Sequence, residues 1–310
     1  MSPTFSIIIP HKGIPDLLMR CLRAIPVSAD IQVIVVDDNS SDADTYLDKY
    51  PELSRPYLEF IRTTKGGGAG YARNVGLEHA KGKWLLFADA DDFYVDDMYS
   101  IICSYVDSDA DAIYFKKKSV LSEDISITTE RCSHVNKNID NFLSNGDEWP
   151  IRAQMYEPWG KMVKRDVMVK HDIRFDEVMY ADDAYCSLQI GYYARTILVV
   201  NRVLYVVTYR SNSQTYHFCL KPNELRLRAE AAFRMDKFML QNDFCREHRL
   251  NFFLVKMLTH DRRLFKYYFF KLEEIYPSKL AALQDICKNR PRRFKIKFYL
   301  YSFLVWLRVL

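Results

Sequence analysis

The first 120 residues alternate short apolar runs with segments of helical periodicity, and this alternation limits the fold more than any other feature of the sequence. Continuous apolar runs rich in β-branched residues and separated by helices are typical of a parallel sheet that helices cover on both faces. The expected strands cover residues 5–10, 31–37, 58–61, 84–88 and 112–116, and the expected helices lie near 15–25, 42–49, 69–80 and 95–106. We therefore predict an α/β fold with a doubly wound, mainly parallel sheet.

The character of the chain changes after this region. Residues 121–220 begin with a loop-rich stretch and continue with a helical pattern near 182–194 and a strand-like run, ILVVNRVLYVVTY, at 197–209. From Asn223 onward apolar residues recur at three- and four-residue spacing, which indicates two or three consecutive helices. The expected parts are an α/β half at 1–120, a second half of the same domain at 121–220 and a C-terminal helical extension at 221–310.

The C-terminal extension is strongly basic. Residues 221–310 hold 20 Lys and Arg against 9 Asp and Glu, whereas residues 1–220 hold 24 against 31. A basic cluster at 290–297 precedes a ten-residue apolar run, 298–307, which is too short to span a bilayer. These features predict a helix lying in the interface of an anionic membrane; docking on the protein's own core or on a second copy is the alternative. We expect no nucleic-acid partner, because no recognised binding module is present.

The cysteines and the N-terminus indicate the compartment. The seven cysteines are scattered and include no CxxC pair, which argues against a zinc site and against a disulfide framework. This usage fits a reducing cytoplasm. The first apolar run has only five to six residues and no basic residues before it, so we interpret it as a strand and not as a signal peptide.

Two aspartates follow the expected strand at 84–88. Asp89 and Asp91 are two residues apart, so their side chains point to the same side and can share one hard cation. Mg²⁺ or Mn²⁺ held by such carboxylates together with substrate phosphates would neutralise the charge of a departing diphosphate. An acidic turn is the alternative for an isolated DxD sequence, and we expect the neighbouring Asp92 to take no part.

Polar and glycine-rich segments also follow the second and third expected strands. Asp38 could accept hydrogen bonds from a base or a ribose, while Asn39 and Ser41 could cap the following helix. The glycines at 66–70 open a helix that contains Arg73, and glycines at a helix start let a phosphate approach backbone N–H groups. A flexible loop and a surface arginine are the alternatives here.

A second acidic pair, Asp182 and Asp183, lies at the start of the helical pattern near 182–194. One of these carboxylates could act as a general base that takes a proton from an acceptor hydroxyl. Both could instead be caps that the helix dipole stabilises. The residues alone leave both interpretations open.

The order and spacing of these elements resemble the family 2 glycosyltransferases, which have the GT-A fold and mostly invert the anomeric centre. The similar segments are SIIIPHKG, VIVVDDNSSD, GGGAGYARNVGLEHAKGKWLLFADADD, PWGKMVKRD, IRFDE, ADDAYCSL and YRSNSQT. They lie within residues 4–217, about two-thirds of the chain. Each motif is weak by itself, whereas the set in this order is specific.

The resemblance implies roles for individual residues. The implied donor-binding residues are Pro10, Asp38, Gly67, Arg73 and Asp89, and the implied metal ligands for Mn²⁺ or Mg²⁺ are Asp89, Asp91 and His217. The residue that matches the base is Asp183, but Asp182 stands where the family usually has glutamate, so the choice between the two carboxylates stays open. Trp159 and Lys161 resemble an acceptor-binding PWGK element, although Trp159 could simply be buried.

The resemblance also implies a reaction. The base would deprotonate an acceptor hydroxyl as it attacks the anomeric carbon of a nucleotide-sugar, with a UDP-sugar favoured. The QxxRW element of processive synthases is missing, which favours the addition of a single sugar. The implied acceptor is a saccharide or a polyprenyl-diphosphate-linked saccharide in cell-surface polysaccharide biosynthesis, at the cytoplasmic face of the bacterial inner membrane. The alternatives are an inactive glycan- or nucleotide-binding protein of the same fold and a nucleotidyltransferase, and an oligomer is compatible with the sequence.

Overall fold

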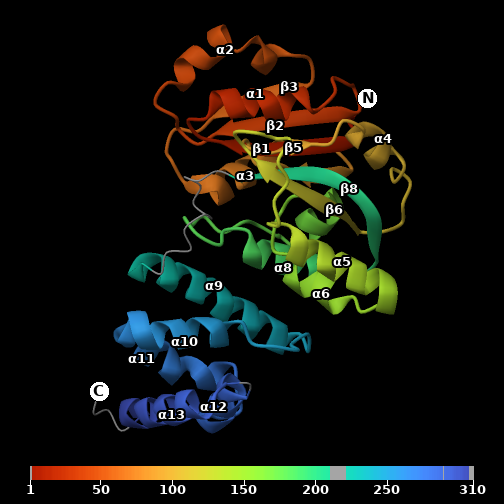
Figure 1. Cartoon of the computed structure of the whole chain (residues 1–310). Helices are drawn as coiled ribbons and strands as arrows, with labels where there is room; N and C mark the ends of the chain where they lie inside the picture. Colours follow the sequence, from red (N-terminus) through yellow and green to blue (C-terminus); the bar gives the residue numbers. More distant parts are fainter. Residues whose placement is uncertain (1, 210–220, 289, 307–310) are drawn as a thin grey trace. The chain divides into compact units, whose positions relative to one another are not determined.

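The computed structural model of the chain describes residues 2–209, 221–288 and 290–306 (Figure 1). The chain divides into two compact units, Met1–His217 and Phe218–Leu310. Each unit has an apolar core of its own, as expected for parts of a chain that each bury a substantial apolar surface. The first unit contains the sheet, and the second is helical in its described residues.

The sheet has eight strands within the described residues, in the order β3-β2-β1-β4-β7-β6-β8-β5. The strands are β1 (Phe5–His11), β2 (Ile31–Asp37), β3 (Leu58–Arg62), β4 (Trp84–Phe87), β5 (Phe93–Tyr94), β6 (Ala112–Leu121), β7 (Lys161–Lys164) and β8 (Ile197–Tyr209). The pairs β1–β2, β1–β4, β2–β3 and β6–β8 are parallel, and the pairs that include β5 or β7 are antiparallel. The predicted α/β sheet with mainly parallel strands is therefore confirmed.

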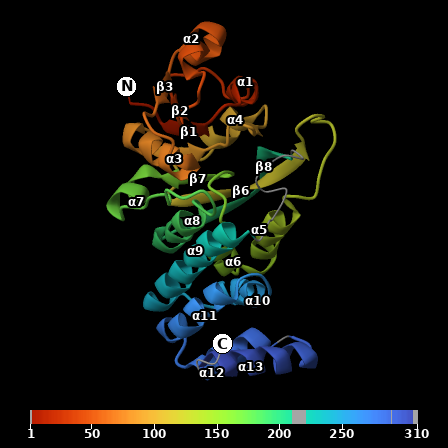
Figure 2. The same ribbon diagram turned by 90° about the vertical axis from the view of Figure 1, so that its left-hand side faces the viewer.

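Helices cover both faces of this sheet. In the described part of the first unit they are α1 (Pro15–Arg23), α2 (Tyr46–Lys49), α3 (Gly68–His79), α4 (Met98–Cys103), α5 (Ser133–Asn145), α6 (Trp149–Gln154), α7 (Arg165–Lys170) and α8 (Ala184–Tyr193). Alternate residues of β1 serve opposite cores: Ile7 and Ile9 pack with the α1 side, and Ile8 packs with the α3 side. Figure 2 shows α1 and α3 on opposite sides of β1 and β2. This arrangement explains why the strand is buried along its whole length.

Three expectations about this unit need correction. The stretch expected to be loop-rich contains α5 and α6, which sequence periodicity did not reveal because α5 buries only Val135 and Ile139. The helix expected near 95–106 is shorter, at Met98–Cys103. The helix expected near 42–49 is a 3₁₀ turn followed by the single turn α2. Strands β5 and β7 were not predicted, because two and four residues are too few to show a period.

The second unit contains more helices than expected. Its described residues form α9 (Pro222–Gln241), α10 (Leu250–His260), α11 (Arg262–Lys271), α12 (Lys279–Cys287) and α13 (Arg292–Trp306). The prediction of two or three helices was wrong because the break between α10 and α11 contains neither glycine nor proline. It is made by Asp261, whose side chain accepts a hydrogen bond from the N–H of Leu264 at 2.9 Å and caps α11.

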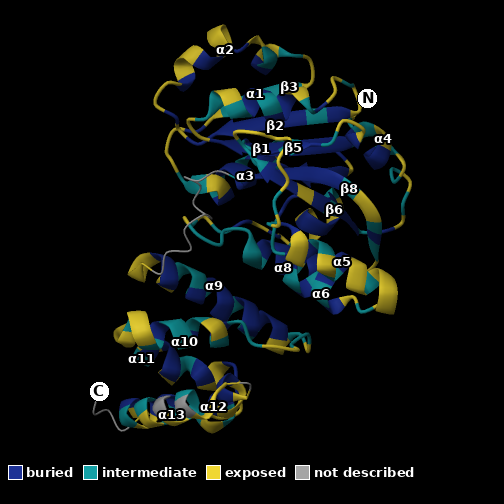
Figure 3. Cartoon of the chain, viewed as in Figure 1, coloured by how far each residue is buried: buried dark blue, intermediate teal, exposed yellow. Residues whose placement is uncertain are grey.

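The core of the second unit is rich in aromatic and aliphatic side chains from all five of these helices. Figure 3 shows buried residues on the inner faces of its helices and exposed residues on their outer faces. Among the described residues, no helix has both the length and the apolar character needed to cross a membrane.

Candidate active site

The carboxyl ends of three neighbouring parallel strands, β2, β1 and β4, carry several of the residues singled out in the sequence. Pro10 is buried in β1 opposite Val36 of β2. Asp38 follows β2 directly, and Asp89 begins the turn after β4. Ligands of open α/β sheets bind at this edge of the sheet, beyond the ends of the parallel strands. The local fold therefore brings these segments together where a nucleotide would be expected.

The carboxylate of Asp38 fastens the glycine-rich segment to the end of β2. It accepts a hydrogen bond from the N–H of Gly67 at 2.7 Å and another from the N–H of Gly68 at 3.0 Å. The exposed ammonium of Lys12 donates to the same carboxylate at 3.1 Å. Asp38 and Gly67 are thus next to each other, as their expected common role requires, and Lys12 adds a cation that the sequence did not single out.

A buried hydrogen-bonded group holds the turns after β1 and β2. His11 Nδ1 lies 2.8 Å from Asp37, and the hydroxyl of Ser40 donates to the same carboxylate at 2.7 Å. The N–H of Ile14 donates to His11 Nε2, so the neutral ring donates through Nδ1. Burial opposes the charge of Asp37, but the hydrogen bonds from His11 and Ser40 outweigh it and lower its pKa. These contacts hold the backbone of the turns next to Asp38 in place.

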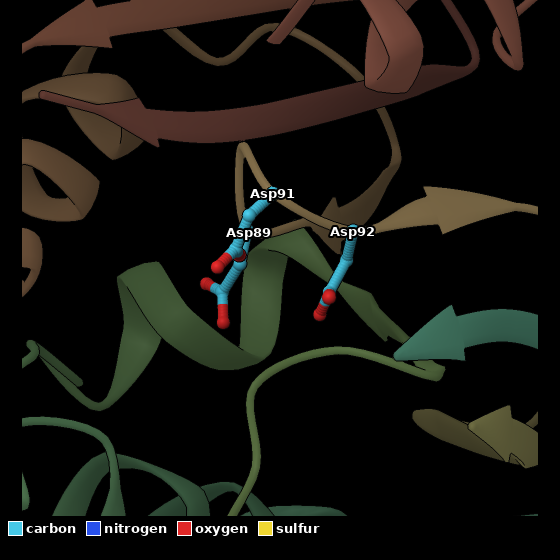
Figure 4. A group of neighbouring side chains, drawn as sticks. All are labelled: Asp89, Asp91 and Asp92. Atoms are coloured by element: carbon cyan, nitrogen blue, oxygen red, sulfur yellow. The ribbon is translucent and has the colours of Figure 1, made fainter. Parts of the chain in front are cut away.

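Three carboxylates gather in the turn between β4 and β5. The side chains of Asp89, Asp91 and Asp92 each offer an oxygen, and these oxygens lie within 4.8 Å of one another. Figure 4 shows all three side chains pointing to the same side of the turn. Carboxylate oxygens are the ligands that Mg²⁺ and Mn²⁺ prefer, so this donor set fits such an ion. Asp92 was expected to take no part in a metal site, but its carboxylate belongs to this group.

Asp92 differs from its two neighbours in its surroundings. It is buried and accepts a hydrogen bond from the N–H of Thr208 at 2.6 Å. Burial and the nearby charges of Asp91 and Asp89 raise its pKa well above the usual value for an aspartate. A divalent cation would relieve this repulsion, which is a second reason why the group fits a metal.

Strand β8 supports the acidic turn from the other side. The N–H of Asp89 donates to the hydroxyl of Tyr205 at 2.8 Å, and the hydroxyl of Thr208 donates to the carbonyl of Asp91 at 2.7 Å. Trp159 stacks on Tyr205 with ring centroids 5.4 Å apart. Trp159 is therefore packed behind the turn and 7% exposed. His217, the third expected metal ligand, lies outside the described residues.

Arg73 links the acidic turn to the second acidic pair. Its guanidinium donates to Asp89 through Nη2 and to Asp182 through Nη1, each at 2.6 Å. The Arg73 side chain is 5% exposed. Burial opposes its charge, but Asp89 and Asp182 outweigh burial and raise the pKa of Arg73. In this structure Arg73, which was expected near the donor, bridges two acidic segments from opposite halves of the unit.

Asp183 is left as the carboxylate of the second pair that Arg73 does not bind directly. It is the residue before α8, but its side chain makes no capping hydrogen bond. Burial among protein atoms and the charge of Asp182 raise the pKa of Asp183 to about 7, against the opposing effect of Arg73. Ala181, two residues earlier, has a φ of 58°, a left-handed conformation that turns the chain sharply before the two carboxylates. The two aspartates therefore differ: Asp182 is bonded to Arg73, and Asp183 has a pKa raised to about 7.

Lys161, which was expected in an acceptor-binding element, is a buried residue at the start of β7. It is 1% exposed, and its ammonium donates to the carbonyl of Met155 at 2.9 Å and to the hydroxyl of Ser187 at 3.4 Å. Burial lowers its pKa to about 8. Its position is interior because β7 is an internal strand of the sheet, between β4 and β6.

Two further charged residues near Trp159 were missed in the sequence. Lys117 of β6 is 1% exposed, and its ammonium, which has no hydrogen-bond partner among the described residues, lies 5.9 Å from the Trp159 ring centroid. Burial lowers its pKa to about 7. Glu157 has a buried carboxylate oxygen that likewise lacks a described partner. Glu157 stands in the EPWGK segment, which was a usable signal, whereas Lys117 stands in a KKK run that is typical of a solvated surface.

The chain is similar in sequence to known glycosyltransferases. Residues 6–171, more than half of the chain, match the family described as Glycosyl transferase family 2. Glycosyltransferase GlyA of Streptococcus pneumoniae serotype 4 is 24% identical over 218 residues, which cover 67% of this chain and 31% of GlyA. Glycosyltransferase YibD of Escherichia coli K12 is 24% identical over 212 residues, which cover 64% of this chain and 60% of YibD. The chain thus spans less than two-thirds of the length of either relative.

Solved structures show the same fold. The structure of Staphylococcus aureus TarS residues 1–349 in complex with UDP-GlcNAc is similar with a TM-score of 0.65 and 20% identity, covering 88% of this chain and 82% of that one. The mannosyltransferase PcManGT of Pyrobaculum calidifontis, in complex with GDP-Man and Mn²⁺, has a TM-score of 0.51 and 15% identity, covering 99% and 87%. The expected GT-A-like fold with C-terminal helices is therefore confirmed. Together with the match over more than half of its length, these findings mean that the chain belongs to glycosyl transferase family 2.

Proposed function

We propose that the chain is a metal-dependent inverting glycosyltransferase that moves one sugar from a nucleotide-sugar to a hydroxyl of a glycan or a lipid-linked saccharide. The contact that carries this proposal is the double ion pair of Arg73, which joins the acidic turn at Asp89 to the segment that holds Asp182 and Asp183. A candidate cation site and a candidate base are thereby held in one fixed arrangement. Transfer chemistry needs both, and simple nucleotide binding does not need the second.

The donor and the acceptor are assigned to different halves of the first unit. We assign residues 1–120 to the donor, because Asp38, Gly67 and Asp89 belong to them, and residues 121–220 to the acceptor, because they contain Asp183. Residues 221–310 form a helical extension outside this assignment. The N–H groups of Gly67 and Gly68 at the start of α3 already donate to Asp38, so the part we assign to Asp38 is to hold the glycine-rich segment against the end of β2.

A divalent cation would be held by Asp89 and Asp91, with Asp92 adding negative charge behind them. When bound, Mn²⁺ or Mg²⁺ supplies electrostatic stabilisation of the departing nucleoside diphosphate. The chain's own part is to hold the carboxylates in place: Tyr205 and Thr208 of β8 fix the backbone of the turn. Such preorganised charge is generally the largest contribution to catalysis of this type.

Asp183 is the proposed general base. The acceptor oxygen forms a bond to the anomeric carbon, the bond from that carbon to the diphosphate oxygen breaks, and the acceptor proton passes to the Asp183 carboxylate. A base is most effective when its pKa lies near the working pH, and the raised pKa of Asp183 meets this condition. Asp182 is less suited, because Arg73 already binds its carboxylate at 2.6 Å.

The donor is proposed to be a UDP-sugar. TarS residues 1–349 bind UDP-GlcNAc in the similar structure, and TarS is described as a poly(ribitol-phosphate) beta-N-acetylglucosaminyltransferase. A segment of 122 residues of this chain is 30% identical to TarS, covering 37% of the chain. The acceptor is proposed to be a saccharide, free or linked to polyprenyl diphosphate at the cytoplasmic face of the bacterial inner membrane.

The proposal is tested first by binding. The melting temperature of the purified protein is measured with UDP, UDP-GlcNAc, UDP-glucose and GDP-mannose, each with and without Mn²⁺. Stabilisation should follow RT ln(1 + [L]/Kd), and a UDP-sugar should stabilise the protein more with Mn²⁺ than without it. Stabilisation by GDP-mannose alone would move the donor assignment, and no stabilisation by any nucleotide would contradict the proposal.

Catalysis is tested with three variants. Release of UDP from the donor identified by binding is measured for Asp91→Asn and Asp183→Asn, with Asp48→Asn as a control at an exposed aspartate of α2. Asp91→Asn should lose the Mn²⁺ effect on donor binding, whereas Asp183→Asn should keep it and lose turnover by about a hundredfold or more. Donor binding with no turnover in the wild type under any acceptor condition would favour the inactive binding protein instead.

A further inference from the structure

The last helix of the chain presents an apolar stripe to solvent. Its members are Ile296, Leu300, Phe303 and Trp306, which are 59%, 58%, 51% and 56% exposed. They are spaced four, three and three residues apart, so they lie along one face of α13. With a rise of 1.5 Å per residue, the stripe is about 15 Å long. Isolated exposed apolar residues are ordinary, but an aligned group of four large ones is not.

The opposite face of α13 is fixed to the core of the second unit. Phe298, Ser302 and Val305 are fully buried. The ring centroid of Phe298 lies 5.8 Å from that of Phe265 in α11, and the ring of Tyr301 lies 5.5 Å from the same phenylalanine. Rotating the helix to hide the stripe would expose these aromatic side chains, so the outward direction of the stripe is built into the packing. The helix therefore docks on the protein's own core through one face and leaves the apolar stripe exposed on the other.

The segment of the chain that contains the stripe carries charges of a single sign. After Asp285 the chain contains seven Lys and Arg and no Asp or Glu. Three of these cations, Lys288, Arg290 and Arg292, are exposed beside the N-terminal end of the stripe. A helix with a lengthwise apolar face and cations at its edge has the chemistry of a segment that lies in the interface of an anionic bilayer.

We propose that α13 docks on an anionic lipid surface, with Ile296, Leu300, Phe303 and Trp306 entering the headgroup region and the cations at 288–292 contacting lipid phosphates. A second copy of the chain fits this face less well. Packing two α13 helices together would bring cationic segments near one another, and no acidic residue follows Asp285 in either copy to offset their charge. This inference concerns the second unit alone and does not depend on the proposed catalytic function.

The first experiment compares lipid surfaces. The full chain is sedimented with vesicles of phosphatidylcholine alone and with vesicles of phosphatidylcholine and phosphatidylglycerol. We expect binding to the anionic vesicles that weakens as salt is raised, because exposed charges are screened, and at least about tenfold weaker binding to neutral vesicles. Equal binding to both kinds of vesicle, or to neither, would overturn the proposal.

The second experiment assigns the binding to α13. The double variant Leu300→Gln/Phe303→Gln removes the middle of the stripe, and Leu143→Gln/Val169→Gln is the matched control at exposed apolar residues of the first unit. The α13 variant should bind anionic vesicles about tenfold or more weakly, with unchanged circular dichroism, and the control should bind like the wild type. Arg290→Glu/Arg292→Glu should also lose binding and should flatten its salt dependence.

Two outcomes would overturn the assignment to a lipid-docking helix. If Leu300→Gln/Phe303→Gln binds vesicles like the wild type, α13 is not the docking helix. If sedimentation velocity finds the wild type dimeric and this variant monomeric, and vesicles bind neither, the stripe is a surface between copies of the chain.

Discussion

Arg73 shows how one side chain can organise a site made of segments more than a hundred residues apart. Its two donor nitrogens in a rigid fork bind Asp89 on one side and Asp182 on the other. A buried arginine between two carboxylates is costly to break, because the charges left behind have lost their counterion. The bridge therefore fixes the distance between the acidic turn and the segment of the candidate base.

The first prediction tests the fork geometry of Arg73. Arg73→Lys keeps the positive charge, but a single ammonium cannot hold two carboxylates in the same way. We expect kcat for sugar transfer to fall about a hundredfold, with a smaller change in donor KM. Arg174→Lys, at a half-exposed arginine, is the control and should keep kcat within about twofold. An Arg73→Lys variant with wild-type kcat would show that the bridge is not needed for catalysis.

The second prediction concerns pH and Asp183. Burial and Asp182 raise its pKa to about 7 in the protein without a metal, and a cation on Asp89 would lower it, so kcat of the Mn²⁺-loaded enzyme should decline at a pH below about 7, as Asp183 takes up a proton. Stability should move the other way. An acid whose pKa is higher in the folded than in the unfolded state binds more protons when folded, so its contribution to the free energy of unfolding decreases as pH rises from about 4 to about 7.

Asp183→Asn separates these two effects. With Mn²⁺ present the variant should lose activity at every pH, and in the metal-free protein it should lose less stability than the wild type as the pH rises from about 4 to about 7. Urea unfolding at several pH values measures this difference. An identical pH dependence of stability in both proteins would mean that the pKa of Asp183 is not raised.

Single residues were predictable from the sequence where the chain itself marks them. Asp38 and Asp89 stand at the ends of apolar strands, and this position, together with the spacing of Asp89 and Asp91 and the family resemblance, made them candidates. The bridge between Arg73 and Asp182 could not be predicted, because the sequence does not show that these two residues come together in the fold. The burial of Lys161 could not be predicted for a related reason: it depends on β7, a strand too short to be predicted.

At the scale of elements, α3 and the segment before α8 lie in close contact. A methyl group added at Gly70 would overlap the carbonyl oxygen of Asp176 and come within 3.1 Å of the Asp182 side chain. The N–H of Asp176 in turn donates to the carbonyl of Asp182 at 2.9 Å. Backbone cannot give way as a flexible side chain can, so glycine is required at this crossing.

The third prediction uses this contact. By helix propensity alone, Gly70→Ala in α3 should stabilise the protein by about 1 kcal/mol. The overlap with Asp176 reverses the sign, and we expect a loss of about 1–3 kcal/mol in the free energy of unfolding together with a loss of activity, since Asp182 is displaced. Gly146→Ala, with φ of 74° and open space around it, is the control for backbone strain alone and should stay active. A stabilised and active Gly70→Ala would refute the close contact.

The elements that sequence patterns predicted well are those with continuous apolar runs. β1, β2 and β4 are buried along their whole length or nearly so, which makes them visible without knowledge of their neighbours. The helices that were missed or miscounted bury few residues or end without glycine or proline. The end of α10 depends on one capping aspartate, Asp261, whose effect is clear only once the hydrogen bond to Leu264 is known.

At the scale of the whole molecule, the two compact units differ in both architecture and charge. Met1–His217 is built on the sheet, whereas Phe218–Leu310 is helical where described and basic in composition. Every residue assigned above to donor, metal or base lies in the first unit. A ligand that binds only the folded form of one unit stabilises that unit directly.

The fourth prediction follows from this division. Differential scanning calorimetry of the full chain should resolve two unfolding transitions, because each unit has its own core. Adding UDP with Mn²⁺ should raise the midpoint of one of them by several degrees at saturating ligand and leave the other unchanged. Asp91→Asn should abolish the shift without changing the number of transitions. A single transition that shifts as a whole would mean that the units unfold together.

The gathering of Asp89, Asp91 and Asp92 beside the Arg73 bridge has a consequence for the proton inventory of the protein. The negative charge of Asp89 contributes to the raised pKa values of both Asp92 and Asp183. A cation bound to Asp89 therefore lowers both pKa values, so cation binding should release protons into the buffer. The affinity for the cation should therefore rise with pH. In the protein without a cation, Asp183 would be protonated and could not accept the proton of an acceptor hydroxyl. Donor first and acceptor second is the sequence of events that this electrostatic coupling favours.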